Sequence, residues 1–236
     1  MDVTEYLNSQ YFGSSQNEKS IMDTVIGDVR ACDFFIDLGA SFGVYTRFAL
    51  ENNPNAKIIC IEPDRFRFSE LQKNVENWRK TQEVQLFQNV VYDRSVDIEF
   101  YTDETQKSGL IGGKLKHSNS YKVSSVRLDD LISEIDKKIV IKIDIEGSEF
   151  GAILGAEELI ANNQVTIILE VHTWGDLLKK RGKPSEVLKQ LKTYGFGTTK
   201  INGRYVLRKS NKGRYLLQYN IFKEAIKESI RRLLNR

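Results

Sequence analysis

The segment from residue 34 to residue 45 constrains the fold of this chain more than any other. An apolar, aromatic run leads through Asp37 to Gly39 and Gly43, and a helical pattern begins at about Tyr45. This order predicts a buried strand, a tight turn and the first turn of a helix. Glycine in such a turn lets a ligand approach the backbone or lets the helix pack against the strand. We therefore expect a small molecule to bind across this turn.

The kind of ligand follows from how the turn departs from the dinucleotide pattern G-x-G-x-x-G. Ser41 stands where the second glycine would be, and Val44 stands where the third would be. Asp37 would repel a diphosphate and suits a cationic ligand. A second buried strand begins at Lys57 and leads to Glu62, about 20 residues past the glycines, where an acid binds ribose hydroxyls in doubly wound folds. A ligand that has a ribose and a positive centre but no phosphate fits S-adenosylmethionine.

Length and composition fit one soluble domain with room for an appendage. The chain has 236 residues, of which 40% are hydrophobic and 28% are charged. No apolar run approaches the roughly 20 residues of a membrane span, and the first residues do not resemble a signal peptide. Cys32 and Cys60 lack the spacing of a disulfide framework or a zinc site. We expect a cytoplasmic protein.

The chain divides into three predicted parts. Residues 1–30 are expected to form a helical cover, residues 31–210 the main domain, and residues 211–236 a basic amphipathic helix. From residue 176 onward there are 17 Lys and Arg against 4 Asp and Glu. This basic end could lie on an anionic membrane surface, which would make the protein peripheral at the membrane, or could bind nucleic acid. The C-terminal helix could equally pack on its own domain or form a homodimer contact.

Strands alternate with helices along the main domain. Beyond the first two strands, we expect helices at residues 64–80, 149–161 and 184–194, strands at 84–91, 96–101, 139–147 and 165–172, and a hairpin at 197–208. Asn202-Gly203 is the two-residue turn signal of that hairpin. The alternation predicts an α/β fold, with a mostly parallel sheet, helices on both faces and an antiparallel hairpin at its C-terminal end. Residues 102–121, rich in Gly, Ser, Lys and Asn, are expected to be a loop that shapes an acceptor site.

Polar residues gather where two of these strands end. They are Lys142, Asp144 and Glu146 in the strand at 139–147, and Glu170 and His172 in the strand at 165–172. Ligands of doubly wound sheets bind outside the carboxyl ends of the strands, so we expect these side chains to meet Asp37 there. Buried charges are costly unless paired, so Lys142 should contact Asp144, Glu170 or Asp37. The alternative is that these charged residues form a buried ion-pair network that has no catalytic role.

A series of motifs, in this order, resembles the FkbM family of S-adenosylmethionine-dependent methyltransferases. They are D-x-G-A-x-x-G at 37–43 with Tyr45, I-E-P at 61–63, L-x-x-N at 71–74, L-D-D-L at 128–131, K-I-D-I-E-G-S-E at 142–149, L-G-A at 154–156 and E-x-H at 170–172. The run at 142–149 is the most specific, and the resemblance covers residues 18–194. Ser41 is a departure, since the family usually carries Asn there, but Ser can also cap a helix.

The resemblance implies a class I (Rossmann-like) methyltransferase fold with a seven-stranded sheet. It also implies O-methylation of a hydroxyl, often on a sugar, glycan or other secondary metabolite. The cofactor residues expected from position are Asp37, Gly39, Ala40, Ser41, Gly43, Tyr45, Glu62, Asn89 and Asp144. Among them, Asp37 would hold the amino-acid end of S-adenosylmethionine directly or through water, Glu62 the ribose and Asn89 the adenine.

Methyl transfer to an alcohol requires an aligned oxygen and a group that removes its proton. His172 is the first candidate base, because the unperturbed pKa of histidine lies near working pH. Asp144 and Glu146 are the next candidates, and Lys142 would orient them. Glu170 completes the expected catalytic set, and a divalent metal on Asp144, Glu170 and His172 is also open.

Three other functions stay open. A dinucleotide-dependent oxidoreductase shares the sheet and the ribose acid, but the glycine pattern argues against it. A nucleic-acid methyltransferase would use the basic C-terminal end and bind with strong salt dependence; the chain lacks the Asn-Pro-Pro-aromatic motif of base amino-methylation. A non-catalytic module would bind the cofactor and methylate nothing.

Overall fold

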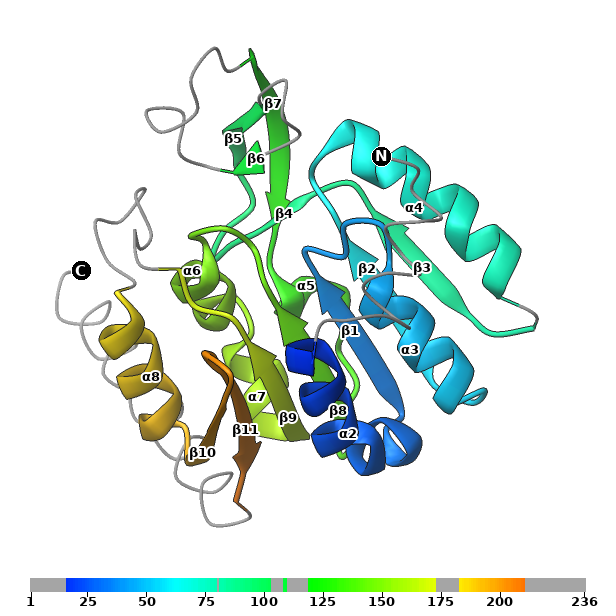
Figure 1. Ribbon diagram of the computed structural model, residues 1–236. Helices are drawn as coiled ribbons and strands as arrows, with labels where there is room; N and C mark the ends of the chain where they lie inside the picture. Colours follow the sequence, from blue (N-terminus) through cyan, green and yellow to red (C-terminus); the bar gives the residue numbers. More distant parts are fainter. Residues whose placement is uncertain (1–15, 80, 103–107, 110–118, 173–182, 211–236) are drawn as a thin grey trace, which may run out of the picture.

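The computed structural model describes residues 16–79, 81–102, 108–109, 119–172 and 183–210. Its main element is a seven-stranded sheet in the order β10-β11-β9-β8-β1-β2-β3 (Figure 1). Strands β9, β8, β1, β2 and β3 run parallel, and β11 pairs antiparallel with both β9 and β10. The predicted α/β class, the mostly parallel sheet and the antiparallel C-terminal end are confirmed.

The strands of the main sheet are β1 (Phe34–Leu38), β2 (Lys57–Ile61), β3 (Val84–Phe87), β8 (Lys138–Ile143), β9 (Gln164–Leu169), β10 (Phe196–Ile201) and β11 (Arg204–Lys209). The helices are α2 (Gln16–Ala31), α3 (Val44–Asn52), α4 (Arg65–Trp78), α5 (Leu128–Leu131), α6 (Glu149–Leu154), α7 (Glu157–Asn162) and α8 (Pro184–Thr193). A smaller sheet contains β4 (Val90–Val91), β5 (Asp97–Thr102), β6 (Ser108–Gly109) and β7 (Asn119–Val126).

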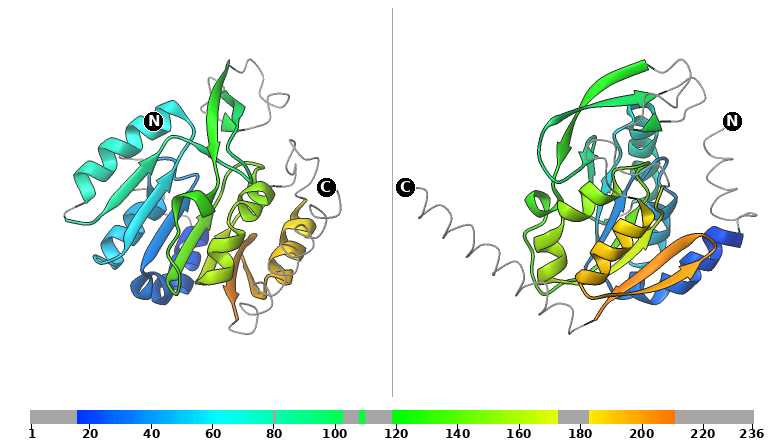
Figure 2. Two further views of the ribbon diagram at one scale, coloured as in Figure 1. Left: turned by 180° about the vertical axis from the view of Figure 1, so that it is seen from behind. Right: turned by 90° about the vertical axis from the view of Figure 1, so that its left-hand side faces the viewer.

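Helices cover both faces of the main sheet, as the two views in Figure 2 show. Helices α2, α3 and α4 pack on one face, where the strands contribute Phe35, Ile58 and Val140. Helices α5 to α8 pack on the other face, with Ile36 and Ile141 at the centre. Adjacent residues of one strand thus enter different core layers, because side chains alternate along a strand.

The predicted helix at the start of the main fold is α2. Ile21, Met22, Val25 and Val29 are buried against the sheet, as the helical spacing predicted. The hairpin prediction is also confirmed, because Ile201 pairs with Arg204 across the Asn202-Gly203 turn and both turn residues have positive φ. Local sequence signals were sufficient for both elements.

Two predictions about the middle of the chain differ from the described structure. Residues 84–91 do not form one strand: the chain leaves the main sheet after Phe87, and Val90–Val91 pairs with β7 in the smaller sheet. The predicted loop at 102–121 overlaps β7, an eight-residue strand that begins at Asn119. Its sequence, NSYKVSSV, is polar at most positions, so its pattern resembled a loop; only long-range pairing with β5 makes it a strand.

The predicted helix at 149–161 is two helices, α6 and α7. A side chain at Gly155 would collide with the carbonyl oxygen of Tyr92, so the chain bends where the smaller sheet approaches it. The predicted strands at 139–147 and 165–172 end early, at Ile143 and Leu169. Their last residues therefore form loops at the carboxyl edge of the sheet.

No helix in the described ranges is both long enough and apolar enough to cross a bilayer. The predicted C-terminal helix at 211–236 lies outside the described residues, and so do the membrane, nucleic-acid and homodimer contacts expected of it. Residues 1–15 of the predicted cover and residues 103–107 and 110–118 of the predicted loop also lie outside them.

Candidate cofactor and acceptor site

The glycine turn joins β1 to α3 at the carboxyl edge of the sheet. Gly39 has a φ of 71° and Gly43 a φ of 95°, both in the region that favours glycine. A side chain on Gly39 would collide with the carbonyl oxygen of Asp144, and one on Gly43 would lie 2.9 Å from Leu71. The glycines are required by close packing against neighbouring elements. Of the two reasons that the sequence suggested, ligand approach and close packing, this is the second.

The expected capping role of Ser41 is wrong. Gly43 is the N-cap residue of α3, and no side-chain cap bond is formed. Instead, the backbone N–H of Ser41 donates to Oε2 of Glu62 at 2.8 Å. Ser41 itself has a φ of 52°, a backbone conformation in which Asn is also found readily.

A cavity of about 280 Å³ adjoins the turn. Its lining includes nine residues that the sequence had placed in the site: Gly39, Ala40, Ser41, Tyr45, Glu62, Asn89, Lys142, Asp144 and Glu146. The lining does not include Asp37, Gly43, Glu170 or His172. The smaller sheet contributes Val90, Val91 and Phe100, so it closes the cavity over the carboxyl edge of the main sheet.

Asp37 is fully buried behind the turn and does not line the cavity, which disfavours the predicted direct contact with a ligand. Its Oδ2 accepts a 2.7 Å hydrogen bond from the hydroxyl of Thr46, and its Oδ1 lies 3.5 Å from Nζ of Lys142. β1 and β8 place Asp37 and Lys142 at the same register position of neighbouring strands. Two side chains on the same face therefore meet directly, which is the predicted pairing of Lys142.

Lys142 connects this buried pair to the cavity. Nζ donates to the carbonyl oxygen of Gly39 at 2.6 Å and lies 3.9 Å from Oδ2 of Asp144. Burial alone would lower the pKa of Lys142, but the nearby carboxylates, chiefly that of Asp37, outweigh it and raise the pKa above its usual value. The lysine therefore stays charged and holds the glycine turn in place.

Glu62 follows β2 and is 3% exposed. Its two carboxylate oxygens accept hydrogen bonds from the backbone N–H groups of Ser41 and Asp64, at 2.8 and 2.9 Å. Burial raises the pKa of Glu62. Each oxygen keeps a further lone pair, and the side chain lines the cavity, so Glu62 can still accept hydrogen bonds from a ligand.

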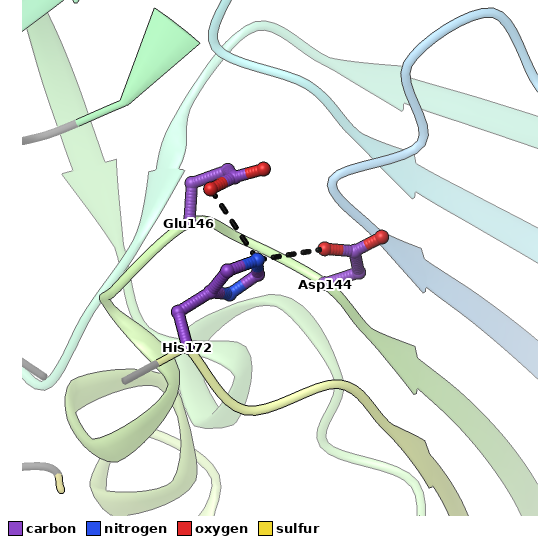
Figure 3. Close-up of side chains that lie close together, drawn as sticks. All are labelled: Asp144, Glu146 and His172. Atoms are coloured by element: carbon purple, nitrogen blue, oxygen red, sulfur yellow. Dashed lines mark ion pairs between the residues drawn. The ribbon is translucent and has the colours of Figure 1, made fainter. Parts of the chain in front are cut away.

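His172 lies among three carboxylates, two of which Figure 3 shows. Nδ1 is 2.6 Å from Oε1 of Glu149, and Nε2 is 3.3 Å from Oε2 of Glu146 and 3.8 Å from Oδ1 of Asp144. Burial alone would lower the pKa of His172, but the hydrogen bond to Glu149 and the surrounding negative charges raise it to about 9. The imidazole is therefore protonated at neutral pH.

The raised pKa argues against His172 as the base, because its imidazole then already carries the proton. An imidazolium has no free lone pair to accept a proton. Asp144 and Glu146, in contrast, line the cavity, with side chains that are 32% and 44% exposed. Burial also raises the pKa of Glu146 above its usual value.

The metal set of Asp144, Glu170 and His172, which the sequence left open, does not come together. Glu170 accepts a 2.5 Å hydrogen bond from Nε of Arg204 instead. Asp144, Glu146 and His172 each offer a ligand atom, and these atoms all lie within 4.8 Å of one another. Glu146 thus takes the place that the sequence had given to Glu170.

Sequence reasoning missed several residues of the site. Glu149 was part of the most specific motif but received no role, although it is 1% exposed and orients His172. Glu18, Arg67 and Arg204 also line the cavity. A search for cations and acids next to predicted turns would have found Arg204, which follows Asn202-Gly203 directly.

Comparison with known proteins agrees with this geometry. The model of the family described as the methyltransferase FkbM domain matches residues 37–197. The chain is 26% identical over 147 residues to 2-O-methyltransferase NoeI of Sinorhizobium fredii (strain NBRC 101917 / NGR234), covering 55% of this chain and 59% of that protein. It is 24% identical over 147 residues to Methyltransferase 1 of Beauveria bassiana (strain ARSEF 2860), covering 53% of this chain and 59% of that protein.

The chain thus spans 59% of the length of each of these two curated relatives. Among solved structures, a proposed rRNA methylase from Clostridium thermocellum superimposes with a TM-score of 0.52 at 11% identity, covering 84% of this chain and 98% of that one. At this identity the likeness concerns the fold alone. The family match extends over more than half of the chain and contains the glycine turn, Glu62 and the carboxylate cluster, and the chain therefore belongs to the FkbM methyltransferase family.

Proposed function

We propose that this protein is an S-adenosylmethionine-dependent O-methyltransferase that acts on a hydroxyl of a sugar, glycan or other secondary metabolite. One observation carries the proposal. A single cavity is lined by the glycine turn and Glu62 and also by two carboxylates, Asp144 and Glu146. The first group of residues suits a nucleoside, and the second suits proton removal from an acceptor.

The charge of the cavity supports this choice of cofactor. Among its described lining residues are four carboxylates, Glu18, Glu62, Asp144 and Glu146, and three cations, Arg67, Lys142 and Arg204. A lining with one excess negative charge favours a ligand with one excess positive charge. S-adenosylmethionine has that charge, because its amino-acid end is a zwitterion and its sulfur is positive. A nicotinamide dinucleotide carries a negatively charged diphosphate, which fits this lining less well.

When bound, S-adenosylmethionine would supply an activated methyl group on its sulfur. The chain must then hold the acceptor oxygen in line and remove its proton. We assign proton removal to Glu146, with Asp144 as the alternative, because both carboxylates face the cavity. His172 lies behind them and holds Glu146 through Nε2, while Glu149 fixes the ring through Nδ1. Lys142 positions Asp144 from the other side.

The oxygen acceptor is supported by the name of one relative, a 2-O-methyltransferase. The chemistry of the cavity agrees, since an alcohol is a poor nucleophile at neutral pH and needs a nearby base. Two carboxylates at the cavity surface can serve as that base and as hydrogen-bond acceptors for neighbouring hydroxyls. A polyhydroxylated acceptor therefore fits this end of the cavity.

Calorimetric titration with S-adenosylhomocysteine and with NAD⁺ tests the cofactor. We expect saturable heat with the nucleoside and none with the dinucleotide; the reverse result would favour an oxidoreductase. Incubation with methyl-labelled S-adenosylmethionine and a panel of sugars, oligosaccharides, hydroxylated metabolites and RNA then tests the acceptor. Label in an oligosaccharide or metabolite supports the proposal. Label confined to RNA, or cofactor binding without any transfer, would overturn the acceptor class.

A further inference from the structure

Part of the cavity wall is a charged cluster to which the mechanism above gives no role. Arg204 forms an ion pair with Glu18 through Nη1 and donates through Nε to Glu170 at 2.5 Å. The hydroxyl of Tyr45 donates to the second oxygen of Glu18 at 2.5 Å. We name Glu18, Tyr45, Glu170 and Arg204 the rim cluster.

Tertiary structure assembles the rim cluster from four distant elements. Tyr45 lies in the first turn of α3, and Glu170 directly follows β9. Arg204 is the first residue of β11. Because β11 runs antiparallel to β9, its first residue lies at the edge where the parallel strands end. Helix α2 brings Glu18 to the same edge, although 186 positions separate Glu18 from Arg204 in the sequence.

The rim cluster is held firmly and still faces the ligand space. Glu18 is 8% exposed and the side chain of Arg204 is 24% exposed, and both line the cavity together with Tyr45. The aromatic ring of Tyr45 also lies 5.8 Å from Nζ of Lys142, which binds the carbonyl of Gly39. The rim cluster is therefore continuous with the glycine turn.

Another part of the lining is apolar. Its apolar residues include Ile61 at the end of β2, Pro63 just after it, and Val90, Val91 and Phe100 of the smaller sheet, and Glu62 lies between the first two. A cofactor with a planar base, a ribose and a zwitterionic end would match such a cavity in one direction. Its base would contact the apolar lining, its ribose Glu62, and its charged end the rim cluster.

We propose that Glu18 and Arg204 bind the amino-acid end of the cofactor, with Arg204 receiving its carboxylate and Glu18 its ammonium group. The proposal rests on the proposed function. It replaces the role that the sequence suggested for Asp37, which has no exposed surface. An ion pair suits a zwitterion, because each residue of the pair can replace part of its contact with the other by a contact with the oppositely charged group of the ligand. Tyr45 and Glu170 are positioning residues, since each holds one member of the pair.

Binding of truncated cofactors tests the proposal without relying on turnover. S-adenosylhomocysteine carries the complete amino-acid end, 5′-methylthioadenosine lacks it, and decarboxylated S-adenosylhomocysteine keeps only the amine. By calorimetry we expect Arg204→Ala to weaken S-adenosylhomocysteine roughly tenfold to hundredfold, the range for a hydrogen bond to a charged group. Its affinity for the other two ligands should not change. Glu18→Gln should weaken both amine-bearing ligands and leave 5′-methylthioadenosine unchanged.

Arg208→Ala is a matched control. Arg208 also connects β11 to α2, through Asp28 at 2.7 Å and the carbonyl of Thr24 at 2.9 Å, but it does not line the cavity. This variant should bind all three ligands like the parent protein. If Arg204→Ala does not fold, Arg204→Lys keeps the charge without the forked geometry and should show a smaller loss for S-adenosylhomocysteine alone.

The possible outcomes separate the two proposals. If the parent protein binds none of the three nucleosides, the proposed function fails. If the parent binds them and the Arg204 variants bind S-adenosylhomocysteine as tightly as the parent does, only the rim-cluster proposal is overturned. Equal weakening of all three ligands would also overturn it, because the effect would then not concern the amino-acid end.

Discussion

Two cations lie among carboxylates at the carboxyl edge of the sheet, and they differ in what they can do. Lys142 is 7% exposed and contacts Asp37, Asp144 and the backbone of the glycine turn. His172 faces the same Asp144 and also Glu146 through Nε2, and Glu149 anchors its ring through Nδ1. The pKa of Lys142 is raised above its usual value, which already lies well above neutral pH, whereas the pKa of His172 is raised to about 9. One cation is permanent and the other can be titrated.

This difference assigns separate roles to two regions that are close in sequence. The region around Lys142 consists of buried groups that fix the backbone of the turn, so it serves cofactor binding through structure. The region around His172 includes two carboxylates that face the cavity, so it suits a step in which a proton moves. The following predictions test this contrast, from the largest expected effect to the smallest.

Lys142→Met should have the largest effect. It leaves the carboxylate of Asp37 buried without its cation, and loss of one partner of a buried pair typically costs about 3–5 kcal/mol. We expect the free energy of unfolding to fall by about this amount, and S-adenosylhomocysteine binding to be lost because the turn is no longer held. Urea unfolding and calorimetry measure the two effects.

Lys57→Met is the control for this variant. The Lys57–Glu83 pair lies at the surface, with both side chains 50% exposed. Its loss should change the free energy of unfolding by less than about 1 kcal/mol. A similarly small effect of Lys142→Met would mean that the buried pair does not stabilise the turn.

Glu146→Gln should lower turnover while the cofactor still binds. Loss of a positioned proton acceptor typically reduces kcat by about 10²–10⁴-fold. The amide keeps the size of the side chain, so the affinity for S-adenosylhomocysteine should stay at the parent value. Single-turnover methyl transfer measures the first and calorimetry the second, with the exposed Glu76→Gln as control. Parent-like turnover in Glu146→Gln would move the base to Asp144.

His172→Gln should have a smaller effect on turnover, because it removes a positioning residue, and it should alter the pH dependence of stability. The pKa of His172 is about 9 in the folded protein against the ordinary 6.5. Its stabilising contribution is therefore complete below pH 6.5 and is lost as pH rises through 9. We expect the free energy of unfolding of the parent to decline across this range more steeply than that of the variant.

His172→Ala gives a second measurement at the same position. Cofactor affinity should be retained, since His172 does not line the cavity, and turnover should fall. If the alanine variant were as active as the parent and both pH profiles coincided, the histidine would have no part in positioning Glu146.

Chelation of divalent metals should have the smallest effect. The protonated imidazole already places positive charge between Asp144 and Glu146, where a cation would otherwise lie. We expect turnover to be unchanged after EDTA treatment and after addition of Mg²⁺ or Mn²⁺. Loss of turnover with EDTA and recovery with Mg²⁺ would mean that these residues are metal ligands, and the contrast between a permanent and a titratable cation would no longer hold.

Much of the fold could be predicted from local patterns. The strand, turn and helix at 34–52, the buried stripe of α2 and the Asn202-Gly203 hairpin each depend on signals within a few residues of one another. The smaller sheet could be predicted only in part. The strand expected at 96–101 is β5, but β7 is polar and becomes a strand through pairing with β5, which is about 20 residues away along the chain.

The candidate site shows a similar division. The sequence by itself determined that Lys142, Asp144, Glu146 and His172 would meet at one edge, because parallel strands end together. Only the tertiary structure decided the partners of Glu146, Glu170 and His172. Side-chain alternation predicts directions within a strand, but β8 ends at Ile143 and Glu146 lies in a loop with a φ of 53°. The antiparallel β11 therefore brings Arg204 to Glu170, and the loops after the strands bring Glu146 and Glu149 to His172. A periodic sequence pattern does not predict these contacts.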